Sequence, residues 1–254
     1  IPLALIASAM ILAQWYFSDK IVLWSSGAKI VTKEEYPRLH EIVGRLSANN
    51  GLPKPRVALV NSQVPNAFAT GKSPKSSLVA VTTGIMDLLE DDELEAVIGH
   101  ELTHVRSRDV LVLTLASVFS TVAWYLVQFG FFGGLQTRDR NAVGTTAIVM
   151  LVAILTWLVS FLIIRAISRY REYSADRGGA IMTGKPDKLA SALLKISGKI
   201  GSVPPKELEK VQQLNAFFII PALTRSSFAN LFSTHPPVEK RVQKLMEMKS
   251  GMNE

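Results

Sequence analysis

A chain of 254 residues with 48% hydrophobic residues and a mean hydropathy of +0.24 is more apolar than most soluble domains, which points to a membrane. Its 28 lysines and arginines against 21 acidic residues could suit nucleic acid or an anionic membrane surface, but the sequence has no compact basic cluster with interleaved aromatic residues, which argues against nucleic acid. The absence of cysteine excludes disulfides, thiolate metal sites and cysteine nucleophiles, so any metal must be held by His, Asp and Glu.

The first 17 residues form an apolar run, which is at the short limit for a helix that spans a membrane. The run does not start with Met, and it lacks the basic start and the small-residue cleavage site of a signal peptide. We therefore expect residues 1–18 to form a transmembrane helix that is truncated at its N-terminus. A buried amphipathic or core helix is the alternative.

Residues 19–109 have the patterning of a soluble domain with helices and a small sheet. Apolar residues at helical spacing predict an amphipathic helix over 33–52. Two short strands are predicted over 55–61 and 76–84, with an extended or edge segment between them. A helix in two pieces follows over 84–109, and Asp91 and Asp92 are the expected N-cap candidates of its second piece.

Two long uncharged runs come next, over 110–132 and 143–164, and a short polar loop joins them. At a rise of about 1.5 Å per residue, a helix of either length crosses a hydrocarbon core of about 30 Å, so 110–164 is predicted to be a transmembrane hairpin. A pair of buried helices in a large soluble core is the alternative. Arginines are more numerous at the outer ends of the hairpin than in its loop, so these ends should face the cytoplasm.

Residues 165–254 return to soluble patterning. We expect an amphipathic helix over 185–200, a loop with a polar helix over 201–210, an apolar stretch over 214–232 that Pro221 breaks, and a turn with a charged helix over 233–254.

The segment HELTH at 100–104 carries the residues of a metal site. His100 and His104 are four positions apart, so on a helix they share one face about 6 Å apart along the axis and can bind one ion. Glu101 projects beside them, where it can act as general base toward a metal-bound water and later pass the proton to the leaving amine. Two solvated helix histidines are the alternative. A catalytic zinc site also needs a third protein ligand.

Glu172 is the candidate third ligand. It follows the second apolar run, and Asp176 stands four positions later on the same helical face, where it could hold a histidine N–H behind the ligands. A hairpin returns the chain to its starting surface, so it should bring Glu172 beside His100 and His104. These residues predict one Zn²⁺ ion per chain. An ion-paired helix surface is the alternative for Glu172 and Asp176.

Two further segments are candidates for contacts with a substrate. His235 precedes two prolines that stiffen its turn, and it could donate a hydrogen bond to the oxyanion of a tetrahedral intermediate; a structural turn histidine is the alternative. Asn66, Ala67 and Phe68 lie in the segment that could form an exposed edge strand, and an extended peptide could pair with the backbone of Asn66 and Ala67. An ordinary connecting loop is the alternative there. His40 is expected to be structural.

Five segments, HELTHVRSRD, the hairpin after it, EYSAD, PNAFATG and STHPP, together resemble the HtpX family of membrane zinc metalloproteases, relatives of the CAAX prenyl protease. The resemblance runs in order over essentially the whole chain. It implies a zincin-type domain on the cytoplasmic face of a bacterial or archaeal membrane and a role in quality control of membrane proteins. It also implies that His100, His104 and Glu172 bind zinc, that Glu101 is the catalytic base, and that His235 lies near the transition state.

Arg241 follows STHPP where the family usually has arginine, and we expect it to assist the site or to be structural. Such proteins usually begin with two membrane crossings, and here only one, incomplete, is visible.

The sequence thus predicts an α+β, mostly helical integral membrane protein with a small β-sheet and a zincin-like catalytic domain divided between 19–109 and 165–254. The expected function is that of a membrane-bound zinc endopeptidase that cleaves misfolded or loosely folded membrane and cytosolic proteins. Its expected partners are polypeptide substrates and the lipid bilayer, and no particular oligomeric state is indicated. The alternatives are a non-catalytic membrane scaffold with a vestigial metal site, and a protease for prenylated peptides, which would need a large enclosed cavity.

Overall fold

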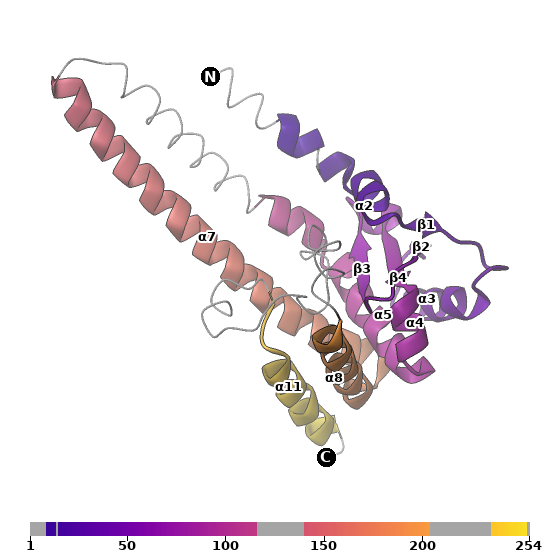
Figure 1. Cartoon of the computed structure of the whole chain (residues 1–254). Helices are drawn as coiled ribbons and strands as arrows, with labels where there is room; N and C mark the ends of the chain where they lie inside the picture. Colours follow the sequence, from indigo (N-terminus) through magenta and orange to yellow (C-terminus); the bar gives the residue numbers. More distant parts are fainter. Residues whose placement is uncertain (1–8, 14, 116–139, 204–234, 253–254) are drawn as a thin grey trace.

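Helices dominate the chain, and one of them projects far beyond the other elements (Figure 1). The computed structural model describes residues 9–13, 15–115, 140–203 and 235–252. Its helices are α2 (Ser18–Ser26), α3 (Pro37–Asn49), α4 (Thr83–Leu88), α5 (Asp91–Arg106), α7 (Arg140–Thr183), α8 (Pro186–Ser202) and α11 (Val238–Met252), with a 3-10 turn η1 (Pro74–Ser76). This composition, with the one small sheet, matches the predicted α+β, mostly helical class.

Within the part of the chain that the structure describes, the sheet has four strands in the order β1-β2-β4-β3. Their bounds are β1 (Lys29–Ile30), β2 (Arg56–Val60), β3 (Ala67–Thr70) and β4 (Leu78–Thr82). β2 and β4 run parallel, and β1 and β3 pair antiparallel with their neighbours. The strands predicted over 55–61 and 76–84 are confirmed as β2 and β4, and β3 lies at an edge, as expected. β1, with two residues, is too short for its sequence to show the alternation of a strand.

Strand side chains alternate between two apolar cores, as the two-residue period of a strand requires. Val79 and Val81 of β4 face the larger core, which contains apolar residues of α3, α5 and α8. Leu78 and Ala80 face a smaller core that α2 closes through Val22. The sheet is therefore covered on both faces, and α5 is fixed beside it.

α5 carries the HELTH segment, and its N-terminus differs from the sequence prediction. The N-cap is Glu90, which has an extended backbone and whose N–H donates to the Glu93 side chain at 3.0 Å. The prediction of Asp91 and Asp92 as N-caps was therefore wrong. Both lie in the first helical turn, where their charges still favour the N-terminal end of the helix dipole.

Glycines allow α5 and α7 to approach closely. A Cβ atom added to Gly179 would lie 2.7 Å from the backbone N of His100 and 3.0 Å from the carbonyl carbon of Gly99. Glu172, Asp176 and Gly179 follow each other at spacings of four and three along α7, so they share the helix face that meets α5. This contact sets how far the carboxylates of α7 lie from the histidines of α5.

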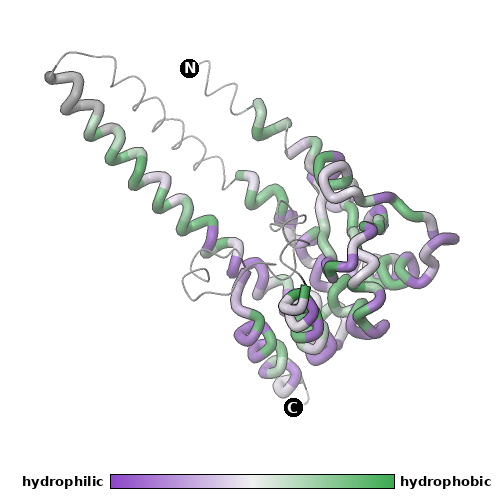
Figure 2. Tube along the Cα trace, viewed as in Figure 1, coloured by the Kyte–Doolittle hydropathy of each residue, from purple (hydrophilic) through white to green (hydrophobic). Residues whose placement is uncertain are grey.

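α7 is one continuous helix that contains both the second apolar run and the EYSAD segment. Among the described residues, its part Met150–Thr183 is the one helical segment long and apolar enough to cross a membrane. Figure 2 shows that the projecting end of α7 is hydrophobic over most of its described length and that hydrophilic residues begin where it meets the other elements.

The predicted helices over 33–52, 185–200 and 233–254 correspond to α3, α8 and α11. Four other predictions lie partly or wholly outside the described residues. The N-terminal helix over 1–18 is described from residue 9, and the first crossing over 110–132 is described to residue 115; both described parts are helical. The loop and polar helix predicted over 201–210 are described only to residue 203, and the apolar stretch over 214–232 is outside the described residues.

Candidate metal centre

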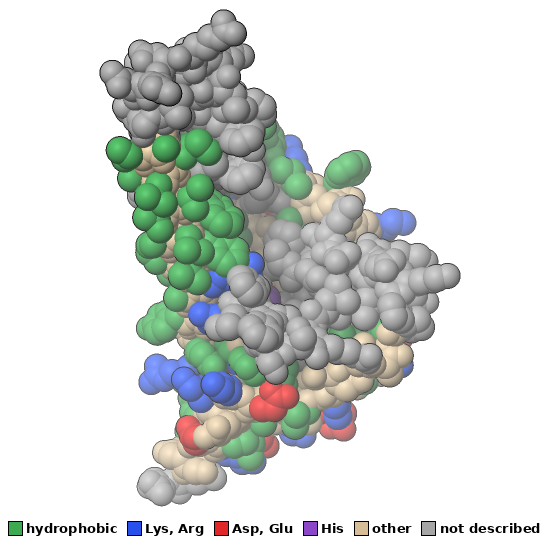
Figure 3. Space-filling view, turned by 60° about the vertical axis from the view of Figure 1, so that its left-hand side comes forward, with side chains coloured by type: hydrophobic (Ala, Val, Ile, Leu, Met, Phe, Trp, Pro, Cys, Tyr) green, Lys and Arg blue, Asp and Glu red, His purple; other side chains and the backbone are tan. Residues whose placement is uncertain are grey.

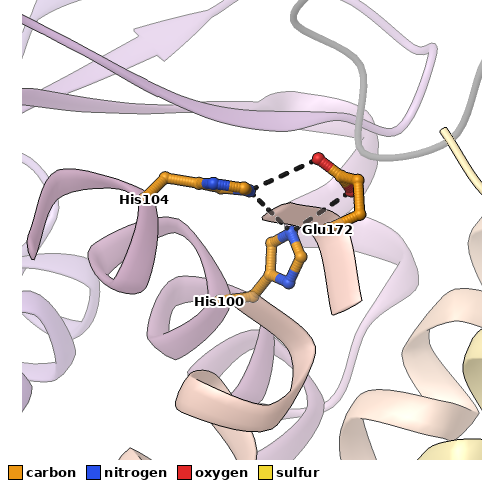
Figure 4. Close-up of side chains that lie close together, drawn as sticks. All are labelled: His100, His104 and Glu172. Carbon is orange, nitrogen blue, oxygen red and sulfur yellow. Dashed lines mark hydrogen bonds and ion pairs between the residues drawn. The ribbon is translucent and has the colours of Figure 1, made fainter. Parts of the chain in front are cut away.

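Three side chains from two helices point toward one another (Figure 4). His100 and His104 lie one turn apart on α5, and their Nε2 atoms are 3.1 Å from each other. Glu172 comes from α7, with Oε1 at 3.6 Å from His104 Nε2 and Oε2 at 3.8 Å from His100 Nε2. One ligand atom from each residue lies within 4.8 Å of the others, so the three could hold a metal ion.

The spacing of these atoms fits a tetrahedral zinc. Ligands at about 2.0–2.1 Å from such an ion lie about 3.3 Å from one another. The two Nε2 atoms, 3.1 Å apart, are close to this value, and each histidine Nε2 has one Glu172 oxygen within 3.8 Å. Two imidazole nitrogens and one carboxylate oxygen also form a donor set that catalytic zinc sites use.

Each histidine has a carboxylate behind its ring. His100 Nδ1 lies 3.0 Å from Oδ1 of Asp176, and His104 Nδ1 lies 2.5 Å from Oδ2 of Asp109. A carboxylate beside Nδ1 favours the tautomer that has its proton on Nδ1, which leaves the lone pair of Nε2 for a metal. Burial also lowers the pKa of His100, which favours the neutral ring that metal binding needs.

Glu101 is buried beside the three residues, with 4% of its surface exposed. Burial raises the pKa of its carboxyl to about 7, and the nearby Glu172 carboxylate contributes to the rise, while His104 and a hydrogen bond with the backbone of Ala69 oppose it. A carboxyl group with a pKa near neutrality is suited both to accept and to return a proton.

Arg241, at the start of α11, holds the carboxylates of α7. Its Nε and Nη2 donate to the two oxygens of Asp176 at 2.8 and 2.6 Å, and its Nη1 lies 3.3 Å from Oε2 of Glu172. His235 Nδ1 is 3.1 Å from the same Glu172 oxygen. The guanidinium is buried, so it neutralises two buried acids where water cannot.

Similarity to known proteins identifies the family of this chain. The sequence profile of peptidase family M48 matches residues 33–249. The chain is a member of peptidase family M48. Together with the HtpX relatives described next, this match confirms the resemblance to the HtpX family, and a family of metallopeptidases implies a metal in the site.

Relatives in the M48 family are closely similar to this chain. It is 55% identical over 241 residues to Protease HtpX homolog 2 of Methanosarcina acetivorans, a match that covers 94% of this chain and 82% of that protein. It is 54% identical over 248 residues to the Protease HtpX homolog of Moorella thermoacetica, which covers 96% of this chain and 83% of that protein.

The crystal structure of Ste24p from S. mikatae shares the fold of this M48 chain, with a TM-score of 0.65 at 15% sequence identity. The match covers 96% of this chain, and the chain spans 57% of the Ste24p chain.

The M48 site brings together most of the residues that the sequence singles out. His100, Glu101, His104, Glu172 and His235 all line one cavity of about 130 Å³, and Asp176 and Arg241 lie directly behind them. His40 is outside this group: its Nε2 contacts the backbone carbonyl of Val31 at 2.9 Å.

The edge strand β3 also borders the cavity, through Phe68 and Ala69. The predicted role of the Asn66 backbone is contradicted, because Asn66 O accepts from Thr82 N at 2.9 Å and Asn66 N donates to Thr82 Oγ1 at 2.9 Å. Backbone groups of an antiparallel strand alternate in direction, so those of Ala67 and Ala69 point away from β4. The substrate contact expected of Ala67 stays a prediction.

Two residues of the site have no counterpart in the sequence predictions. Asp109 contacts His104, and Arg171 Nη2 contacts the same Asp109 oxygen at 2.5 Å. Both flank recognised motifs: Asp109 ends HELTHVRSRD and Arg171 directly precedes Glu172. Their positions beside the motifs are the signal that could have drawn attention to them.

Proposed function

We propose that this chain is a membrane-bound, zinc-dependent endopeptidase that cleaves misfolded or loosely folded membrane and cytosolic proteins. The observation that carries the proposal is the convergence of His100, His104 and Glu172 beside the buried carboxyl of Glu101, in a cavity bordered by the edge strand β3. Family membership alone would not assign these roles to the residues.

His100, His104 and Glu172 would hold the ion. When bound, zinc acts as a Lewis acid that lowers the pKa of water toward about 7 and polarises a peptide carbonyl. The set contains no thiolate, and three protein ligands would leave a fourth position for water or substrate, as in catalytic rather than structural zinc sites.

Glu101 would act as general base toward the attacking water and then return the proton to the leaving amine. Its burial beside the cavity supports this role, since the carboxyl can exchange a proton near neutral pH. His235 borders the same cavity and would donate a hydrogen bond to the developing oxyanion.

β3 would bind the substrate as an added strand. The backbone of Ala67 and the carbonyl of Ala69 point away from β4 at the sheet edge, and the hydrogen bond that the Ala69 N–H donates to Glu101 places this edge next to the proposed base. Main-chain hydrogen bonds do not depend on the side chains of the substrate. This mode of binding therefore suits an enzyme that accepts many sequences, provided that the bound segment of the substrate is extended. Folded proteins rarely offer such a segment, so loosely folded proteins are the expected substrates.

α7 would anchor the enzyme in the bilayer. Large apolar side chains in its projecting part, including Leu151, Leu155 and Leu162, are exposed. Figure 3 shows this apolar surface on one side of the molecule, with lysines and arginines where it ends. Such basic residues at the end of an apolar helix favour the cytoplasmic side, so we place the catalytic domain there.

The variant Glu101→Gln tests the catalytic part of this proposal. Amide and carboxyl have nearly the same shape, so the variant should keep one zinc per chain but lose cleavage of an unfolded protein such as casein by at least a hundredfold. Zinc content by elemental analysis and cleavage by gel electrophoresis report the two properties. A variant that cleaves as fast as the parent would contradict the proposal, and a parent that holds zinc without cleaving would indicate the scaffold alternative.

A further inference from the structure

The backbone between α5 and the next helical segment brings Asp109 to a place that a regular helix would not allow. Five residues after His104 on a continuous helix, Asp109 would lie about 140° around the axis, and the two side chains would point apart. α5 ends at Arg106, however, and Arg108 has a φ of 53°, in the left-handed region. For a residue with a Cβ atom, this conformation is less stable than the right-handed one by roughly 1–2 kcal/mol.

The result of this turn is a short chain of contacts. Asp109 Oδ2 lies 2.5 Å from His104 Nδ1 and 2.5 Å from Arg171 Nη2. Asp109 is 6% exposed, so water screens these contacts little. Since Arg171 directly precedes Glu172, the contacts connect the second histidine of α5 with the carboxylate-bearing turn of α7.

A purely structural ion pair does not explain this arrangement well. Nε and Nη1 of Arg171 are buried and have no hydrogen-bond partner among the described residues, which is unfavourable for a guanidinium. A buried pair with such unsatisfied donors stabilises a fold weakly or not at all. Strained backbone and unsatisfied polar groups at one place are more typical of a functional site than of a stabilising one.

We propose that Asp109 is a positioning residue for the metal ligand His104 and that Arg171 holds Asp109 in place. Asp109 accepts a hydrogen bond from the Nδ1–H group of His104, which fixes the tautomer and the ring orientation and makes Nε2 a stronger metal ligand. Asp176 has the same relation to His100, so each histidine has its own carboxylate. The inference rests on the proposed function only in that His104 binds a metal.

The test measures metal binding rather than peptide cleavage. Asp109→Ala, Asp109→Asn and Arg171→Met are made in the full chain with Glu101→Gln, so that self-cleavage cannot interfere. Zinc affinity is measured by competition with a chromophoric chelator, and the visible absorption of bound Co²⁺ reports the ligand geometry. Asp19→Ala is the matched control, because it breaks another Arg–Asp pair, with Arg56 at 2.6 Å, outside the site.

Asp109→Ala should weaken zinc binding about 10- to 100-fold, the range for partners of metal-bound histidines, and should change the Co²⁺ spectrum. Asp109→Asn keeps an acceptor oxygen without the charge, and we expect a loss of about three- to tenfold. Arg171→Met should give a loss of similar size to Asp109→Asn, and Asp19→Ala should change neither readout.

Two results would separate the failure of this inference from the failure of the proposed function. If the Glu101→Gln parent binds neither zinc nor cobalt, the metal site itself is wrong. If the parent binds both, and Asp109→Asn and Asp109→Ala bind zinc within twofold of it with an unchanged cobalt spectrum, Asp109 does not position His104. Should Asp109→Ala fail to fold by circular dichroism, Asp109→Asn alone decides.

Discussion

Gly179→Ala tests whether the close contact of α5 and α7 sets the geometry of the metal site. The added Cβ would lie 2.7 Å from His100 N and 2.9 Å from His100 Cα, both of which are backbone atoms that no side-chain rotation can move away. To restore an ordinary contact of 3.4 Å, the helices must separate by about 0.7 Å locally. Glu172 lies two turns away on the same face of α7, so it moves with the helix.

A displacement of this size is larger than the spread of about 0.2 Å in ligand–zinc distances. We expect Gly179→Ala to weaken zinc binding about 100-fold and to lower the zinc-free stability by about 1–3 kcal/mol through overpacking. At a zinc concentration of 100 times the parental Kd, zinc should stabilise the parent by about 2.7 kcal/mol and the Gly179→Ala variant by only about 0.4 kcal/mol.

The assay is thermal or urea unfolding of the purified protein with and without zinc, together with chelator competition. Gly198→Ala is the matched control, since Gly198 lies on the exposed side of α8 and an added Cβ meets nothing within 4 Å. It should keep the parental zinc affinity and gain up to about 1 kcal/mol of stability, because alanine favours a helix over glycine. Parental zinc affinity in Gly179→Ala would refute the argument that this contact sets the site.

Two further predictions concern the support of the site and the binding of substrate. Arg241→Met leaves the buried carboxylates of Asp176 and Glu172 without their arginine partner. Urea unfolding should show that even the zinc-free protein is destabilised by about 3–5 kcal/mol. A loss of stability confined to the zinc-bound form would contradict this. A peptide substrate with N-methyl groups at alternate amides that face Ala67 and Ala69 should be cleaved at least tenfold more slowly, whereas methylation of the intervening amides should have little effect. Equal rates in the two methylated series would argue against binding at the edge of β3.

The part of the site that follows local rules could be predicted from sequence. His100 and His104 share a helix face because of their spacing, and the pattern of Glu172 and Asp176 suggested a ligand with a supporting carboxylate. The structure places Glu172 beside the histidines, with α7 packed on α5.

The contacts that depend on backbone direction could not be predicted. Asp109 reaches His104 only because Arg108 adopts a left-handed conformation, and no glycine signals that turn. The outward direction of Ala67 and Ala69, rather than Asn66, depends on the register of β3 with β4, and a shift by one residue reverses it. The contact at Gly179 requires knowing which turns of α5 and α7 meet.

Metal analysis of Glu172→Ala beside the parent tests most directly whether α5 and α7 together form a zinc site. The parent should hold one zinc per chain after dialysis against zinc-free buffer, and the variant, with only His100 and His104, should lose it under the same conditions. Circular dichroism should show that the variant keeps its helical content. A folded Glu172→Ala variant that retains zinc as tightly as the parent would contradict the assignment of the third ligand.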